Sequence, residues 1–373
     1  MSDPRVDRVA RLLVERMLAV GPGQTLLVEC EPLAEPLLER VVWRAAARDA
    51  HVVVVAASER VRRALLEASS PVTLAREHRA HTALMETVDA ILRIECATST
   101  RPNAGLAADR YPAYLHGRAP GNAVRQQRTL DGTFRWAVGM HPCAAFAAEA
   151  GLALADYEDL VYRAAKCDRE DPEAAWDRQG AEQARLIELF EAGTELRIVA
   201  PGTDVAMRID GRRWRNSCAA RNLPDGEVFT GPVEDSVEGV VEFTYPAIHG
   251  GRLVEGIRLV FEGGEVVEAT ARTGQDVLDE ALATDAGSRR LGEVGIGTNY
   301  GLDRFTTSTL LDEKIGGTVH LALGSGYPET GSVNRSAEHW DLVCDLRSGG
   351  EIVLDGRTIQ RDGRLVPELG IDL

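Results

Sequence analysis

The chain has 373 residues, of which 44% are hydrophobic and 27% are charged, and its formal net charge is −16. This length is enough for about two domains with proper cores, and the composition is that of an ordinary globular protein. The negative charge argues against nucleic acid and anionic membranes as partners, and the sequence has no apolar run of about 18 residues that would predict a membrane span.

The start of the sequence and its cysteines bear on the compartment. Residues 1–8 are polar and charged, and they lack the basic start and apolar core of a signal peptide. The six cysteines are widely spaced and form no CxxC pair, which argues against a zinc ribbon or a redox motif and favours a reducing environment. We therefore expect a cytoplasmic protein.

The first half alternates between helical and strand patterns. Helical spacing of apolar residues predicts helices over residues 6–17 and 37–47. Short apolar runs predict strands at residues 25–28, 51–55, 90–94 and 135–139. The β-branched run 51–55 is typical of a strand that is buried on both faces. Strands separated by helices predict a mostly parallel α/β sheet.

The pattern of predicted elements changes after a long charged helix that we expect over residues 171–192. From residue 195 onward, short alternating strands and glycine turns dominate, and one helix near residues 274–283 interrupts them. We predict an α/β domain over residues 1–190 and a β-rich α+β domain, which would be catalytic, over residues 191–373. The two lysines, Lys166 and Lys314, stand among 42 basic residues, a bias that we attribute to genome composition.

His320 lies in an apolar segment, residues 318–324, that predicts a β-strand. Because alternate residues of a strand share a face, the valine and leucines of this segment would enter a core. His320 would then face the other way, beside Ala322 and Gly324. Such small neighbours leave room for an ion or a substrate, although a lone histidine can also be hydrogen-bonded at a sheet surface.

His339 and Asp341 share one face of the next predicted strand, with Trp340 and Leu342 packed behind them. A His-x-Asp pair on a strand can present an imidazole nitrogen and a carboxylate oxygen to one ion. The structural alternative is a His–Asp hydrogen bond that holds the strand in place.

Two glutamates upstream have similar surroundings. Glu293 shares a strand face with Gly295 and Gly297, and Glu227 begins a strand after the turn at residues 224–226. Each of them alone could be an exposed strand residue. Together with the histidines and Asp341, they make five potential ligands on small-residue faces. Imidazole and carboxylate suit Zn, Co, Mn or Fe, and a bridging carboxylate can hold two ions about 3.5–4 Å apart, so the pattern predicts a dinuclear hydrolytic centre.

Several spaced stretches of the sequence share their content and order with one protein family. They are residues 226–230, 232–239, 291–294, 312–313, 320–324 and 327–328, followed by Asn334, Ser336, His339 and Asp341. In these stretches the chain resembles the aminopeptidase T / aminopeptidase S family of metalloaminopeptidases. Residues 18–25 fit more loosely, and the resemblance spans nearly the whole chain.

The resemblance implies a set of site residues. The metal ligands would be Glu227, Glu293, His320, His339 and Asp341. Glu293 would bridge two divalent ions (Zn, Co, Mn or Mg), and Tyr327 would lie beside them. Glu313 matches a glutamate that some accounts of the family place at the site, although the glycines at 316–317 lengthen its spacing to His320 here. The segment between the two histidines is correspondingly short.

The resemblance also implies an activity and an assembly. The protein would hydrolyse N-terminal residues from peptides through a water activated by two metal ions. Glu293 would serve as the bridging carboxylate at the reacting centre, and Tyr327 would hydrogen-bond to the tetrahedral oxyanion. A homodimer with enclosed active sites would exclude folded proteins and admit peptides.

Two other functions compete with the aminopeptidase. His320, His339 and Asp341 could form a two-His, one-carboxylate triad for a single Fe(II), as in ring-cleaving dioxygenases related to this family. That site would leave Glu227 and Glu293 without a role. A non-catalytic protein stabilised by metal is the second rival. Serine or cysteine hydrolase and phosphate-binding motifs are absent from the sequence.

Overall fold

The computed structural model describes residues 3–373. These residues form two compact units. The first runs to Glu173 and also contains Ala219–Pro224, and the second comprises Ala174–Cys218 and Asp225–Leu373. The predicted fold class is confirmed, because the first unit holds a parallel sheet with helices and the second is rich in antiparallel strands. The domain boundary that we predict near residue 190 stays a prediction, since compactness alone does not define an independently folding domain.

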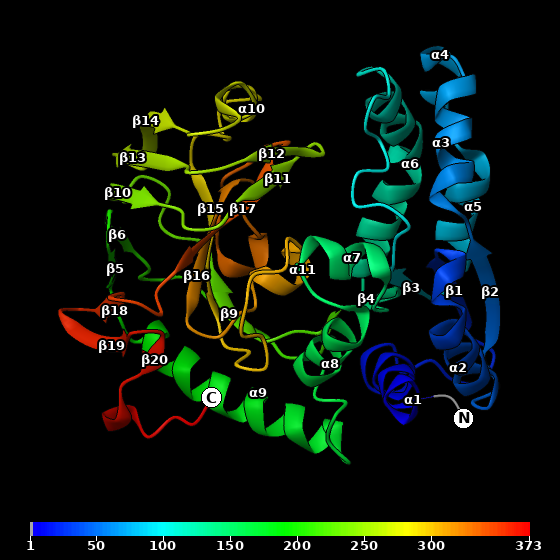
Figure 1. Ribbon diagram of the computed structural model, residues 1–373, viewed down its shortest axis with the longest axis horizontal. Helices are drawn as coiled ribbons and strands as arrows, with labels where there is room; N and C mark the ends of the chain where they lie inside the picture. The colour runs from blue at the N-terminus through cyan, green and yellow to red at the C-terminus, as the bar shows by residue number, and fades with distance from the viewer. Residues whose placement is uncertain (1–2) are drawn as a thin grey trace. The chain divides into compact units, whose positions relative to one another are not determined.

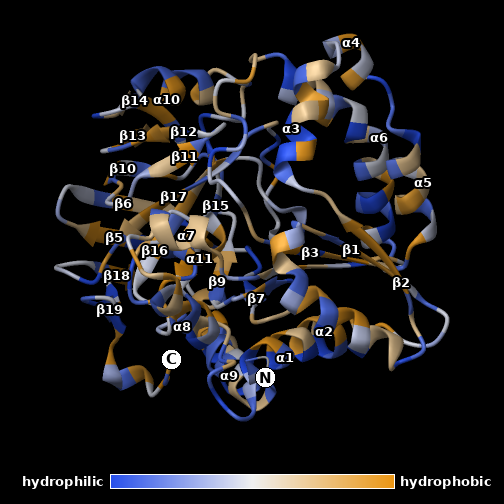
Figure 2. Ribbon diagram, turned by 45° about the vertical axis from the view of Figure 1, so that its right-hand side comes forward, coloured by the Kyte–Doolittle hydropathy of each residue, from blue (hydrophilic) through white to orange (hydrophobic). Residues whose placement is uncertain are grey.

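The first unit is built on one parallel sheet, sheet A, with strand order β2-β1-β3-β4-β8. Its strands are β1 (Thr25–Cys30), β2 (His51–Ala56), β3 (Ala90–Glu95), β4 (Arg135–Met140) and β8 (Asn222–Leu223). Figure 2 shows β1 largely in the hydrophobic colours, as expected for a central parallel strand.

The prediction that residues 51–55 are buried on both faces is wrong. Strand β2 is the edge strand of sheet A, and Val53 and Val54 are 37% and 42% exposed. A β-branched run specifies a strand, but it does not specify whether a second neighbour covers that strand.

Helices lie on both sides of sheet A. Those of the first unit are α1 (Pro4–Arg11), η1 (Leu12–Met17), η2 (Pro32–Ala34), α2 (Glu35–Ala46), α3 (Glu59–Ala68), α4 (Pro71–Leu74), α5 (Arg79–Thr87), α6 (Arg110–Leu130), α7 (Ala144–Glu149) and α8 (Leu154–Ala164). Helices α1 and α2 lie on one side of the strands, and α5 and α6 lie on the other (Figures 1 and 2). Among residues 3–373, no helix is both long and apolar enough to cross a lipid bilayer.

The second unit contains two larger sheets and a hairpin. Sheet B has the order β14-β13-β10-β6-β5-β18-β19-β20, and sheet C has the order β17-β16-β15-β9-β7. The strands of sheet B are β5 (Glu195–Ala200), β6 (Thr203–Arg208), β10 (Glu238–Glu242), β13 (Arg258–Glu262), β14 (Glu265–Thr270), β18 (Glu351–Leu354), β19 (Arg357–Arg361) and β20 (Arg364–Leu365). Those of sheet C are β7 (Arg215–Ser217), β9 (Glu227–Thr230), β15 (Leu291–Gly297), β16 (Thr318–Gly324) and β17 (His339–Asp345).

A hairpin and several helices complete the second unit. They are the hairpin strands β11 (Ala247–His249) and β12 (Arg252–Val254), and the helices α9 (Pro172–Glu191), α10 (Gln275–Leu282), α11 (Thr309–Asp312), η3 (Pro328–Thr330) and η4 (Pro367–Leu369). The first residues of α9 belong to the first unit.

One hydrophobic core joins sheets B and C. Leu196 and Val205 enter it from sheet B, and Val294, Leu321 and Leu342 enter it from sheet C. Because successive side chains of a strand point to opposite faces, the neighbours of these core residues in sheet C emerge on the other face. That outer face carries the candidate ligands.

Candidate metal centre

The strand register of sheet C brings the candidate ligands together. Glu293 on β15 pairs with Ala322 on β16, which pairs in turn with Asp341 on β17. One step along the sheet, Gly295 is the register partner of His320. The alternation that we predict for all three strands is confirmed, because the core-facing residues lie in the shared hydrophobic cluster.

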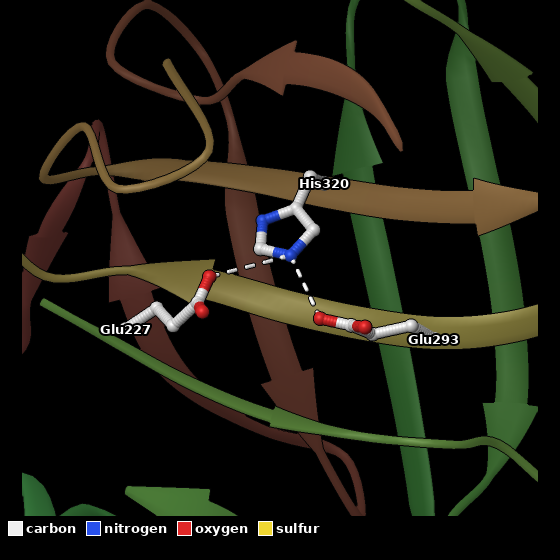
Figure 3. Close-up of side chains that lie close together, drawn as sticks. All are labelled: Glu227, Glu293 and His320. Atoms are coloured by element: carbon white, nitrogen blue, oxygen red, sulfur yellow. Dashed lines mark hydrogen bonds and ion pairs between the residues drawn. The ribbon is translucent and has the colours of Figure 1, made fainter. Parts of the chain in front are cut away.

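Glu293 lies between the two histidines. His320 Nε2 is 3.1 Å from Glu293 Oε1 and 3.5 Å from Glu227 Oε2, as Figure 3 shows. His339 Nε2 is 3.8 Å from the other oxygen of Glu293 and 3.6 Å from Asp341 Oδ1. The two carboxylate oxygens of Glu293 therefore face different histidines, which is the arrangement that a bridging ligand needs.

The side chains fall into three groups that could each hold an ion. In each group, one potential ligand atom per residue lies within 4.8 Å of the others; the groups are Glu227-Glu293-His320, Glu293-His339-Asp341 and Glu313-His320-Asp341. Glu227 Oε2 is buried and has no hydrogen-bond partner among residues 3–373. An unsatisfied buried carboxylate oxygen is costly, so this atom fits a site that a cation completes.

Burial is graded across the site. The side chains of His320 and Glu227 are 1% and 6% exposed, whereas those of Asp341 and His339 are 13% and 29% exposed. Tyr327 is on the open side, where its ring lies 5.4 Å from that of His339. A substrate would therefore approach from the side of His339 and Asp341.

The electrostatics of the site follow from burial among carboxylates. Burial and the neighbouring charge of Glu313 together raise the pKa of Asp341 to about 6, against the opposing charge of His339. Burial and the nearby Glu293 and Asp341 raise the pKa of Tyr327 well above its usual range, so its hydroxyl stays a hydrogen-bond donor at neutral pH.

Lys314 is a site residue that sequence reasoning missed. Its side chain is 1% exposed, and its Nζ lies 2.6 Å from Glu227 Oε1 and 2.6 Å from Glu313 Oε1. A sequence signal was present, because Lys314 is one of two lysines in an arginine-rich chain and directly follows a candidate ligand. Composition alone also accounts for a small number of lysines, so this signal does not by itself identify Lys314 as a neighbour of the site.

Asn334 and Ser336 hold the loop before His339 through hydrogen bonds. The Asn334 side-chain amide donates to the carbonyls of Gly287 and Gly324, at 2.9 and 2.6 Å. Ser336 Oγ accepts from the backbone N–H of Glu338 at 3.0 Å. These bonds set the start of β17 and therefore the direction of the His339 side chain.

Gly295 provides the space for His320, and replacing it with alanine is expected to displace that imidazole. A Cβ at Gly295 would lie 2.1 Å from Cε1 and 2.2 Å from Nε2 of His320. We expect metal affinity to fall by about tenfold or more, as when other supports of a metal ligand are removed, measured by equilibrium dialysis with Zn²⁺. Gly21→Ala is the matched control, since its Cβ would meet nothing within 4 Å. Unchanged affinity in Gly295→Ala would contradict the role of His320.

Comparisons with known proteins agree with this geometry. The family model described as thermophilic metalloprotease (M29) matches residues 2–363. Aminopeptidase 2 of Geobacillus stearothermophilus is 29% identical over an alignment of 410 positions, which covers 98% of this chain and 96% of that protein. Aminopeptidase T of Thermus thermophilus is 37% identical over 188 positions, covering 46% and 45% of the two chains. The solved structure of wild-type AmpT from Thermus thermophilus has the same fold, with a TM-score of 0.83, 24% identity, and coverage of 97% and 99%.

Proposed function

Since the chain belongs to the thermophilic metalloprotease family (M29), we propose that it releases N-terminal residues from peptides at a centre of two divalent metal ions on sheet C. The observation that carries the proposal is the position of Glu293, which belongs to two of the three ligand groups. The relatives named above are aminopeptidases, which gives the reaction class.

We assign the ligands by their groups. Glu227 and His320 would hold the buried ion, His339 and Asp341 would hold the more exposed one, and Glu293 would bridge them. Glu313, which lies in the third group, would contribute a further carboxylate oxygen to the metal centre, next to its ion pair with Lys314. Nitrogen and oxygen donors without thiolate suit Zn, Co or Mn, and Mg would be held by the carboxylates.

The mechanism assigns separate tasks to the side chains. When bound, the two ions would polarise the scissile carbonyl and lower the pKa of the attacking water. The bridging carboxylate Glu293, or a glutamate that the ions leave free, would accept the proton of that water and deliver it to the leaving amine. The Tyr327 hydroxyl, which stays protonated, would donate to the developing oxyanion. The free α-amine of the peptide would be held at the acidic site, so that cleavage stops after one residue.

Metal stoichiometry tests the proposal first. We expect close to two Zn, Co or Mn per chain by elemental analysis of protein purified without chelator, together with hydrolysis of amino-acid p-nitroanilides. A single iron per chain without hydrolysis would instead support the mononuclear ring-cleaving dioxygenase built on His320, His339 and Asp341. That alternative is not favoured, because it gives Glu227 and Glu293 no role.

We further propose that the enzyme works in the cytoplasm as a homodimer. The six free, buried cysteines support the first part of this proposal. The mass of one chain is 40.4 kDa, so sedimentation equilibrium would distinguish a dimer from a monomer.

Metal affinity is expected to rise with pH. Burial by itself lowers the pKa of His320, but its hydrogen bond to Glu293 and the charge of Glu227 outweigh this effect and raise the pKa to about 10. In the metal-free protein His320 is therefore protonated at neutral pH, and an ion must displace that proton. We expect affinity to increase up to about tenfold per pH unit for each proton released, between about pH 6 and 9.

Titration calorimetry checks this expectation. The heat of Zn²⁺ binding, measured at one pH in two buffers of different ionisation enthalpy, gives the number of protons released. An affinity that does not change with pH, with no proton release, would contradict the protonated state of His320.

A further inference from the structure

A pocket adjoins the open side of the candidate metal centre. It lies between β17, which is the edge strand of sheet C, and the hairpin β11–β12. The side chains that define it are Ala247, Ile248 and Leu253 of the hairpin segment, Phe305 of the loop before α11, and Asp341 and Val343 of β17. None of its apolar lining is used by the mechanism described above.

The pocket is continuous with the metal centre through β17. His339, Asp341 and Val343 alternate along this strand and therefore share its outer face. Asp341 belongs to two of the candidate ligand groups and also lines the pocket. Val343 is two residues further on, about 6.5 Å along the strand. A peptide whose scissile carbonyl reaches Asp341 would therefore place its first side chain over Val343.

The chemistry of the pocket favours an apolar occupant. Its hairpin wall exposes two large apolar side chains, Ile248 and Leu253, each of which is 37% exposed. Asp312 also lines the pocket, but it is buried, and its Oδ1 accepts from the backbone N–H and the hydroxyl of Thr306, both at 2.8 Å. The hairpin wall of the pocket is therefore apolar. Of the two acidic residues in the lining, Asp312 is already hydrogen-bonded to Thr306, and Asp341 faces the candidate metal centre; Thr307 and Thr309 complete the lining.

We propose that this pocket receives the side chain of the N-terminal residue of the peptide and selects branched apolar side chains of leucine size over alanine and over lysine. The assignment rests on the proposed aminopeptidase function and names its substrate preference. Filling an apolar pocket discriminates by about 10–200-fold per methylene at most. We expect the leucine substrate to exceed the alanine substrate in kcat/KM by at least about tenfold.

The test compares four p-nitroanilides, those of leucine, alanine, lysine and phenylalanine, with metal-loaded enzyme. Ile248→Glu places a charge on the pocket wall. We expect it to lower the leucine-to-alanine ratio of kcat/KM by at least about tenfold and to raise the relative rate on lysine. Val267→Glu is the matched control, because Val267 is a 49% exposed valine on β14 outside the pocket. Its ratio is expected to match that of the wild type.

A second variant tests the same pocket wall in case Ile248→Glu does not fold. Leu253→Ala enlarges the same wall without adding charge, and it is expected to shift preference from leucine toward phenylalanine. Equal rates on leucine and alanine in the wild type, a wild-type preference for lysine, or an equal loss on all substrates in Ile248→Glu would each overturn the pocket assignment. If metal-loaded wild type cleaves none of the substrates, the proposed function itself fails. The two failures are therefore distinguishable.

Discussion

Glu293→Gln is expected to abolish most of the peptidase activity and to release at least one of the two metal ions that we propose. Glu293 is the carboxylate that faces both histidines, with one oxygen toward His320 and the other toward His339. Glutamine keeps the shape but removes the negative charge and replaces one oxygen with an amide nitrogen that cannot accept. The proton acceptor for the attacking water is lost as well, which alone is worth about 10²–10⁴-fold in rate.

Two measurements on the same preparation separate these effects. Elemental analysis gives the ions per chain, and hydrolysis of leucine p-nitroanilide gives kcat. Glu265→Gln is the control, because Glu265 of sheet B forms an ion pair with Arg290 and lies in none of the ligand groups. A Glu293→Gln enzyme with two ions and wild-type turnover would eliminate both the bridging and the catalytic assignment.

The sequence correctly predicted which side chains of the candidate ligand strands point away from the core, because this depends only on alternation along each strand. In β17, polar and apolar residues alternate as His339-Trp340-Asp341-Leu342, and this parity alone decides which side chains leave the core. The same logic does not identify neighbours across strands. Lys314 lies outside any strand, and it reaches Glu227, 87 residues away, through the fold. The alternation of side chains along one strand could not predict that contact.

Two features that depend on segments far apart in the chain, the pocket and the burial of β2, could not be predicted from the sequence either. The pocket combines the hairpin β11–β12, the loop before α11 and strand β17. The burial of the run at residues 51–55 depends on what packs around β2, which pairs with β1 on one side and has no strand on its other side within residues 3–373. Both depend on the packing of segments that no local pattern specifies.

By the family resemblance, Gly316 and Gly317 lengthen the segment between Glu313 and His320. The two glycines form a turn, where Gly317 has a φ of +90°. The Gly316 N–H donates to the Asn299 carbonyl at 3.0 Å, which fixes that turn. The extra length is therefore absorbed before β16 begins. Glu313 stays within reach of His320 and Asp341, although its role as a ligand remains a prediction.

Lys314→Met is expected to destabilise the metal-free protein strongly and the metal-loaded protein much less. Burial alone lowers the pKa of Lys314, but the charges of Glu227 and Glu313 raise it well above its ordinary value, so the ammonium is charged at neutral pH. Removing it leaves these carboxylates buried without their counter-charge, and breaking a buried ion pair from one side costs about 3–5 kcal/mol. Bound divalent ions would supply positive charge to the same carboxylates, and they also stabilise the folded state by mass action.

Chemical denaturation of Lys314→Met with and without Zn²⁺ measures this difference. Arg197→Met is the matched control, since Arg197 and Asp204 form an ion pair of the same 2.6 Å length with both side chains about half exposed. We expect that control to change stability little, because solvent screens an exposed pair. Lys314→Arg keeps the charge but not the shape, so partial recovery by arginine would assign the effect to charge. Two results together would show that Lys314 is not the counter-charge of the metal-free site. The first is a loss of unfolding free energy in Lys314→Met no larger than that in Arg197→Met. The second is that Zn²⁺ leaves the difference in unfolding free energy between Lys314→Met and the wild type unchanged.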